Sequence, residues 1–312
     1  MNILVTGSNG QLGRCLANVL EEEYPKTKHN YIFVDHNELD ITSQVEVSDI
    51  VREHNIKAII NCAAYTNVDG AEEKMLDAMK VNQVGPGILA NAMKGVGGFL
   101  IHISTNFVYS PFNGWDGGPF TVADAEKSSP LNIYGLSKRM GEIAVKESGC
   151  SYLILRTSWL YSGYGTNILT KLWDRICNME SHDDVLKYVC DQVSAPTNAF
   201  NLARNILRYC EEGEGSFAGQ SIANYSDGGV ASMYDFAYFA AELWGFPNKI
   251  QACYTRDFRS KAVRPKYAVM DLRCNIEAPT WEPIILDWRE SLRGYLDRWR
   301  SILSDENSAE EQ

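Results

Sequence analysis

In the first half of the chain, short apolar runs alternate with longer segments in which apolar residues recur every three or four positions. The runs predict buried strands at 2–7, 31–35, 57–65, 98–110 and 151–161. The longer segments predict helices at 11–23, 47–55, 72–95 and 133–148, with Gly85, Pro86 and Gly87 disturbing the third. Strands that alternate with helices in this way form a parallel sheet. We therefore expect an α/β fold with a doubly wound, Rossmann-type parallel sheet.

The pattern becomes less regular after about residue 160. Helical periodicity returns at 167–179, 198–213 and 233–246, whereas 185–197 and 262–274 are irregular with short strand-like pieces. We expect residues 1–160 to form a nucleotide-binding domain, to which a segment at about 190–210 returns. Residues 161–300 should be mainly a smaller mixed substrate-binding lobe over the carboxyl edge of the sheet, where such sheets bind ligands. Residues 301–312 should be a flexible tail.

Composition excludes several classes of protein. The 312 residues carry a net charge of −11, and no cluster of Lys and Arg indicates nucleic-acid binding. No apolar run is long enough to cross a membrane, and the N-terminus lacks the features of a signal peptide. The eight scattered cysteines are typical of reduced thiols in a cytoplasmic protein, and the five histidines form no metal-binding pattern.

A glycine array follows the first predicted strand. Gly7, Gly10 and Gly13 have the spacing that permits a tight turn, close approach of a pyrophosphate, and packing of helix against strand. The helix that follows offers backbone N–H groups to phosphate. Asp35 lies 22 residues beyond Gly13, where an acid commonly holds the adenine ribose and favours NAD over NADP. The alternative is that Asp35 is a turn residue at the end of a strand.

Tyr134 and Lys138 lie on one face of a predicted helix, because residues four apart are neighbours there. An ammonium beside a phenol should lower the pKa of the phenol and let it exchange a proton with a carbonyl or alcohol oxygen. Alone, such a pair is usually structural. Here Ser104 and Thr105 end a predicted strand at the ligand-binding edge, so that Thr105 becomes a candidate to hydrogen-bond the reacting carbonyl.

Together these motifs resemble the extended short-chain dehydrogenase/reductase family and, within it, the dTDP-4-dehydrorhamnose reductases. The resemblance rests on "GSNGQLG", "NCAAYTNVDGAE", "STNFVYS", "SPLNIYGLSK", "LRTSWLYSGYGTN", "DQVSAPT" and "VRPKYAVMD", between residues 2 and about 271. It implies reduction, by NADPH or NADH, of the C4 ketone of dTDP-4-dehydrorhamnose to dTDP-L-rhamnose, a step in cell-wall polysaccharide synthesis.

The resemblance also implies roles for individual residues. The catalytic residues would be Thr105, Tyr134 and Lys138. Cofactor contacts would come from Gly7, Gly10, Gln11, Leu12, Gly13, Asp35, Asp40, Ile41, Ala63, Ala64, Thr66, Asn82 and Lys138. The sugar nucleotide would meet Val68, Asp69, Asn106, Phe107, Trp159 and Arg264. Of these, Arg264 is a candidate for the diphosphate, since Arg suits bidentate phosphate contacts.

The chain departs from the family pattern at one place. The family usually reads S-T-D-Y-V-F where this chain has "STNFVY", so Asn106 and Phe107 replace an acid and a tyrosine. Related dehydratases carry an Asp-Glu pair there, which argues against dehydration. Two alternatives stay open: reduction of another NDP-4-keto sugar, and a non-catalytic NAD(P)-binding subunit like the methionine adenosyltransferase β subunit. The chain is expected to be a monomer or homodimer; no magnesium ligands are identified.

Overall fold

The computed structural model describes residues 1–181, 184–212, 217–273 and 282–297. Its strands are β1 (Asn2–Thr6), β2 (Asn30–Val34), β3 (Ile56–Asn61), β4 (Phe99–Thr105), β5 (Ser151–Thr157), β6 (Leu160–Tyr161), β7 (Leu186–Val189), β8 (Val193–Ser194), β9 (Thr197–Asn198), β10 (Gln220–Asn224), β11 (Ala231–Ser232) and β12 (Ile250–Cys253). Its α-helices are α1 (Gln11–Glu23), α2 (Gln44–Glu53), α3 (Val68–Glu73), α4 (Met75–Met79), α5 (Gly85–Val96), α6 (Ile133–Ser148), α7 (Ile168–Cys177), α8 (Ala199–Glu212) and α9 (Met233–Trp244). A further helix occupies 288–297, and η2 (Asn106–Val108) is a short 3₁₀ turn.

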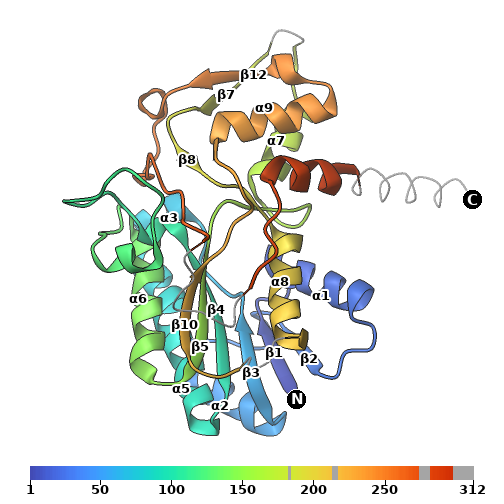
Figure 1. Ribbon diagram of the computed structural model, residues 1–312, viewed down its shortest axis with the longest axis vertical. Coiled ribbons are helices and arrows are strands. Elements are labelled where there is room, and N and C mark those ends of the chain that lie inside the picture. Colours follow the sequence, from blue (N-terminus) through green and yellow to red (C-terminus); the bar gives the residue numbers. More distant parts are fainter. Residues whose placement is uncertain (182–183, 213–216, 274–281, 298–312) are drawn as a thin grey trace, which may run out of the picture.

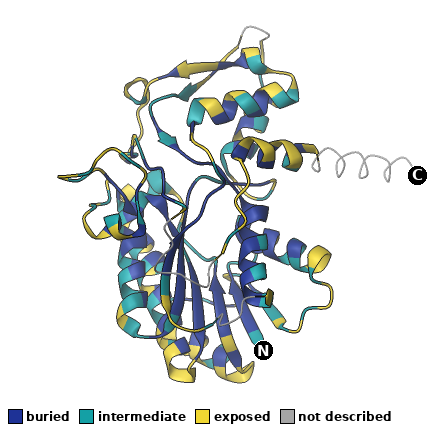
Figure 2. Cartoon of the chain, in the orientation of Figure 1, coloured by how far each residue is buried: buried dark blue, intermediate teal, exposed yellow. Residues whose placement is uncertain are grey.

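The central sheet has six parallel strands in the order β10-β5-β4-β3-β1-β2, which confirms the expected fold class. Successive strand residues face opposite sides: Ile3 and Val5 pack with α1 and α8, whereas Leu4 packs with α2 and α5. Figure 1 shows these helices on the two faces, and Figure 2 shows the buried strands between them. Burial on both faces explains the nearly continuous apolar runs in the sequence.

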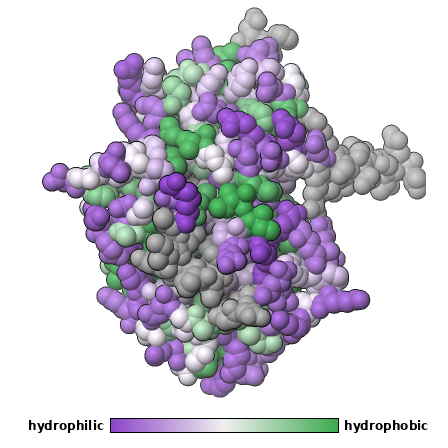
Figure 3. Space-filling view, viewed as in Figure 1, coloured by the Kyte–Doolittle hydropathy of each residue, from purple (hydrophilic) through white to green (hydrophobic). Residues whose placement is uncertain are grey.

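The smaller lobe lies above the carboxyl ends of the strands (Figure 1). It contains the paired strands β7 and β12, together with α7, α9 and the helix at 288–297. Its separate core includes Tyr161, Phe236 and Trp288. On the face viewed in Figure 3 the surface is largely hydrophilic, with small hydrophobic groups in its middle. Among the described residues, none of the helices is long and apolar enough to span a membrane.

The chain returns to the sheet domain over a longer stretch than the expected 190–210. Helix α8 packs on α1 and covers one face, and β10 then pairs with β5 as the edge strand, so that the return extends to Asn224. The sequence pattern does not predict β10, because five residues with two apolar positions give a weak strand signal. The expected tail at 301–312 lies outside the described residues.

The sequence predicts that the helix is disturbed at residues 85–87. The irregular turn in fact lies just before them, at 80–84. A π-helical turn, η1 (Lys80–Val84), joins α4 to α5, and the backbone stays helical at Gly85. Pro86 has no N–H to donate to the Asn82 carbonyl four residues earlier. Gly141 of α6 packs against that carbonyl so closely that a Cβ would come within 2.1 Å of the oxygen. The wider turn therefore lets α5 and α6 approach each other.

Candidate active site

Two cavities meet at the carboxyl edge of the sheet. The first, of about 860 Å³, runs along the glycine loop and the ends of β2, β3 and β4. The second, of about 580 Å³, lies between the sheet edge and the lobe. Their shared wall consists of Thr66, Thr105, Tyr134, Trp159, Leu160 and Asn167. Tyr134 and Thr105 therefore border both cavities.

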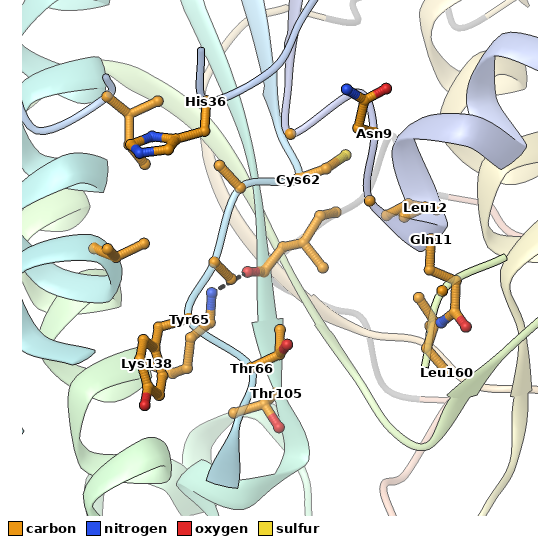
Figure 4. Close-up of a pocket in the computed structure, with 18 of the residues that line it drawn as sticks. Asn9, Gln11, Leu12, His36, Cys62, Tyr65, Thr66, Thr105, Lys138 and Leu160 are labelled. Carbon is orange, nitrogen blue, oxygen red and sulfur yellow. Dashed lines mark hydrogen bonds between the residues drawn. The ribbon is translucent and has the colours of Figure 1, made fainter. Parts of the chain in front are cut away.

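The glycine loop forms an open cradle at the first cavity. Gly7 has φ +68°, and a Cβ on it would lie 2.7 Å from the backbone nitrogen of Ala63. Gly10 caps α1 without any side-chain hydrogen bond, and the first turn of α1 holds no acid. Its backbone N–H groups are thus available to an anion, as the phosphates of a dinucleotide require. Figure 4 shows Gln11 and Leu12 directed from this turn toward the cavity.

Asp35 lines the far end of the first cavity, but its carboxylate also organises the loop. One oxygen accepts hydrogen bonds from the backbone N–H groups of Asn37 (2.7 Å) and Glu38 (3.3 Å), and the other from the Asn9 side chain. Asp35 is therefore a turn residue that also lines the cavity, and its contact with a ribose stays a prediction. Asp40 is held similarly by Thr42, and Lys80 lies 3.9 Å from it.

Helix α6 carries Tyr134 and Lys138 to the junction of the cavities. Its N-cap, Asn132, accepts a hydrogen bond from the Gly135 N–H at 2.8 Å, which starts the helix directly before Tyr134. Lys138 is buried, and its Nζ donates to the Ile103 carbonyl at 2.6 Å (Figure 4). Thr105 ends the neighbouring strand. The structure thus brings all three expected catalytic residues to the first cavity.

The protonation of this group differs from the expectation. Burial raises the pKa of Tyr134 above 10.0, and its hydrogen bond to Thr105 offsets only part of that rise. Burial likewise lowers the pKa of Lys138 to about 8, with the charge of Glu142 acting in the opposite direction. The expected lowering of the Tyr134 pKa by Lys138 is therefore not found. Tyr134 is held protonated, as a proton donor must be.

The exchange of acid for amide at Asn106 has a structural reason. Asn106 is buried, and its Nδ2 donates to Ser194 Oγ (2.9 Å) and to the Ala268 carbonyl (3.0 Å). A carboxylate could not donate to that carbonyl. Asn106 thus joins the sheet edge to the lobe. Phe107 packs edge-to-face on Tyr134, with ring centroids 5.9 Å apart, so it contacts the proton donor directly.

Arg264 and Asp69 form an ion pair beside the second cavity rather than two independent contacts. Arg264 Nη2 lies 2.7 Å from Asp69 Oδ2, and Nη1 lies 3.1 Å from Oδ1. Arg264 lines the second cavity, whereas Asp69 lines neither cavity. This bond is the main cause of the low pKa of Asp69. The expected diphosphate contact at Arg264 therefore starts from a cation that already has a carboxylate.

Trp159 stands on the wall between the cavities in an unusual backbone conformation. Its φ is +40°, in the left-handed region that bulky residues rarely adopt. The Trp159 carbonyl accepts a hydrogen bond from the Thr197 N–H, and the Ser158 hydroxyl donates to the Ala195 carbonyl, so the neighbouring segment holds this conformation. Strain of this kind is commonly kept where a side chain must point into a site.

Most of the remaining expected residues line one of the cavities. In the first are Gly7, Gly10, Gln11, Leu12, Asp35, Asp40, Ile41, Ala63, Ala64 and Thr66, and in the second are Val68, Asn106, Phe107, Trp159 and Arg264. Gly13 and Asn82 do not line either. Gly13 serves packing, since a Cβ would lie 2.5 Å from the Gly7 oxygen. Asn82 is buried, and its side chain binds the backbone of Tyr65 and the Ser137 hydroxyl.

Sequence reasoning missed several cavity residues. Asn9, His36, Cys62 and Tyr65 line the first cavity, and Figure 4 shows them around it. Helix α7 brings Lys171 and Arg175 to the second. Their spacing of four residues on one helix face was the available signal, but no motif marked that face as cavity-lining. Lys171 has no salt-bridge partner in the part of the chain that the structure describes.

No metal centre or disulfide accompanies the site within the described ranges. No group of three or more His, Cys, Asp or Glu side chains there could hold an ion. Likewise, none of the seven cysteines in these ranges forms a disulfide.

Comparisons with known proteins agree on one family. The family model described as the RmlD substrate binding domain matches residues 1–301. A dTDP-4-dehydrorhamnose reductase of Mycolicibacterium smegmatis is 32% identical over 93% of this chain and 84% of its own length. A crystal structure of a dTDP-4-dehydrorhamnose reductase from Clostridium acetobutylicum superimposes with a TM-score of 0.84 at 36% identity, covering 96% of this chain and 100% of that one. The Bacillus anthracis reductase in complex with NADP gives 0.83 at 30% identity, covering 95% and 99%.

Proposed function

The chain belongs to the family of the RmlD substrate binding domain, and we propose that it is an NAD(P)H-dependent reductase of dTDP-4-dehydrorhamnose. The product would be dTDP-L-rhamnose. The observation that carries this proposal is the position of Tyr134 on the wall shared by the two cavities. A proton donor there reaches both a dinucleotide along the glycine loop and a sugar nucleotide under the lobe.

The glycine loop and α1 fit a dinucleotide. Gly7 and Gly10 leave room for phosphates at the N-terminus of α1, and the cavity continues to Lys138 and Thr105. When bound, a reduced nicotinamide would supply the hydride that reduces the C4 ketone. Gly7, Gly10, Gln11 and Leu12 would hold the phosphate end. Lys138, at the other end, would orient the ribose.

The chain's own residues then handle the proton. As charge develops on the C4 oxygen, Tyr134 donates its phenolic proton to that oxygen. Thr105 donates a hydrogen bond to the same oxygen, and the buried ammonium of Lys138 stabilises the phenolate left on Tyr134. Asn106 and Phe107 cannot act as acid and base, so the site favours simple reduction over loss of water. Asn106 ties the lobe to the sheet edge beside these residues.

The second cavity suits a nucleoside diphosphate sugar. Its lining includes Lys171 and Arg175 of α7 together with Arg264. Because Arg264 is already paired with Asp69, we assign the first contact with the diphosphate to Lys171. This assignment rests on the lack of a salt-bridge partner for Lys171 among the described residues.

We place the reaction in the cytoplasm, where reduced cysteines and sugar nucleotides both occur. We expect the chain to be a monomer or a homodimer.

A spectrophotometric assay tests the proposal. Oxidation of NADPH and of NADH is followed with dTDP-4-dehydrorhamnose and with a panel of other NDP-4-keto sugars. We expect turnover with dTDP-4-dehydrorhamnose. Turnover only with another sugar would replace the substrate, and no oxidation with any of them would favour the role of a non-catalytic subunit.

Tyr134→Phe tests the proton donor. The change keeps the ring that packs on Phe107 but removes the hydroxyl, so kcat should fall about 10²–10⁴-fold. Cofactor binding, measured by fluorescence, should stay close to wild type. Tyr238→Phe, a change on the exposed side of α9, is the matched control and should retain wild-type turnover. Survival of most activity in Tyr134→Phe would exclude Tyr134 as the donor.

A further inference from the structure

A buried acid lies directly behind the active-site residues of α6. Tyr134, Lys138 and Glu142 follow one another at intervals of four residues, which places them along one face of the helix. The side chain of Glu142 is fully buried. It contacts neither cavity, and neither the glycine array nor the Tyr-Lys motif includes it. An acid in this position requires an explanation, because burying an unpaired charge is costly.

Four hydrogen bonds hold the Glu142 carboxylate. Oε1 accepts from Ser104 Oγ at 2.6 Å and from Arg156 Nε at 2.9 Å. Oε2 accepts from Arg156 Nη2 at 2.7 Å and from Arg139 Nη1 at 2.9 Å. Arg156 in turn donates to the Tyr109 hydroxyl, at 2.8 Å. The carboxylate therefore clamps α6 to the ends of β4 and β5.

The clamp acts on the strand end that carries Thr105. Ser104 is the residue before Thr105, and in the sheet it pairs with Arg156 of β5. Both residues bind the same carboxylate oxygen. The backbone of β4 is thus fixed relative to α6 at the point where Thr105 and Tyr134 must meet. A displacement of about 1 Å there is enough to slow a reaction substantially.

The same carboxylate balances the charge around Lys138. The ammonium is buried, and its Nζ donates a hydrogen bond to a neutral group, the Ile103 carbonyl. Of the groups that face it, burial raises the pKa of Cys62 to about 12 and lowers the pKa of His102 far below 6.5, so both are neutral at pH 7. The phenol of Tyr134 is protonated. Among these groups Glu142 carries the negative charge, and Arg156 and Arg139 bind it directly.

We propose that Glu142 is a positioning residue of the reductase, which fixes the strand end that bears Thr105 and keeps the buried amine of Lys138 charged beside Tyr134. This role rests on the proposed function, since it acts through the residues assigned to that reaction. Glu142 itself touches no reacting atom. Without its charge, Lys138 would lose its proton at a lower pH and could no longer stabilise a phenolate.

Two substitutions separate charge from shape. Glu142→Gln keeps the length of the side chain but removes the charge, whereas Glu142→Asp keeps the charge and shortens the reach. In the Gln variant the alkaline limb of the kcat–pH profile should move to lower pH by about one unit, with KM for the sugar nucleotide unchanged. The Asp variant should keep the limb near its wild-type position and lose only part of kcat. If the Glu142 carboxylate only held the fold together, its loss would not shift the alkaline limb of the kcat–pH profile.

Glu126→Gln is the matched control. Glu126 is exposed and binds the outer side of Arg139, at 2.8 Å, so the same chemical change there should leave the profile as in wild type. A folded Glu142→Gln variant whose profile superimposes on that of wild type would overturn the proposal. A different result would refute the proposed function: wild-type protein that oxidises NAD(P)H with none of the keto-sugar nucleotides.

Ser104→Ala decides the question if Glu142→Gln does not fold. It removes one neutral hydrogen bond from the carboxylate and leaves both arginines in place. Because that bond fixes β4 beside Thr105, kcat should fall about tenfold while KM stays constant. An unchanged kcat in the folded variant would show that the clamp does not position Thr105, and would overturn the proposal.

Discussion

Two fully buried carboxylates, in two regions of the molecule, have opposite properties. Glu142 lies in the sheet domain and is bound by Arg156, Arg139 and Ser104, and its pKa is lowered to about 2 although burial acts to raise it. Asp227 follows β10 and meets only neutral donors, from Asn198, Asn201 and Ser291, and burial raises its pKa to about 6. Equal burial thus accompanies opposite pKa shifts, because the bonded partners decide whether the ionised or the protonated carboxyl group is more stable.

The two acids also affect stability in opposite directions as the pH changes. Glu142 stabilises the fold above its unfolded pKa of 4.5, and this contribution is lost as the pH falls toward 2. For Asp227 the folded protein binds the proton more tightly than the unfolded chain, so stability falls as the pH rises from about 4 to about 6. The sheet domain is therefore most stable with Glu142 ionised. In contrast, the protonated form of Asp227 is the one that stabilises the fold.

Arg156→Met should give the largest loss of stability. It leaves the Glu142 carboxylate buried without its bidentate partner, which should lower the free energy of unfolding by about 3–5 kcal/mol in urea titrations. The double variant Arg156→Met, Glu142→Met removes both charges and should recover most of the loss. A single variant that loses less than about 1 kcal/mol would mean that the pair is dispensable.

Asp227→Asn should have a smaller and pH-dependent effect. Asn mimics the protonated acid at all pH values, so the variant should lack the loss of stability that wild type shows between about pH 4 and pH 6. A rise of the pKa from 3.8 to about 6 corresponds to about 3 kcal/mol, so the stability difference between variant and wild type should change by up to that amount across the range. Urea titrations at several pH values measure it. A difference that is independent of pH would contradict the assigned protonation of Asp227.

Glu23→Gln should give the smallest effect, and it isolates the role of burial. Glu23 Oε1 lies 2.6 Å from Arg204 Nε, no farther than the buried pair, but both side chains are more than a third exposed. Water screens such a pair, so its loss should cost about 0–1 kcal/mol. The small effect should shrink further in high salt. A loss as large as that of Arg156→Met would show that contact distance, rather than burial, determines the value of these pairs.

The sequence was informative wherever local spacing carries the chemistry. Gly7 and Gly10 lie between β1 and α1 as their spacing indicated, and Tyr134 and Lys138 share a helix face because they are four residues apart. Thr105 was found because a hydroxyl ending a strand is visible in the sequence. Strand β10 was missed, because its partner, β5, lies almost 70 residues earlier and its own apolar pattern is weak.

By itself, then, the sequence determined the alternation of strands and helices, the glycine cradle and the Tyr-Lys helix, since each depends on neighbours in the chain. Only the tertiary structure decided the partners of the charged groups. Asp69 meets Arg264 across 195 positions, and Glu142 meets Ser104 and Arg156 from two strands. A carboxylate's pKa and its role follow from the groups that folding places around it, and local spacing contains no record of them.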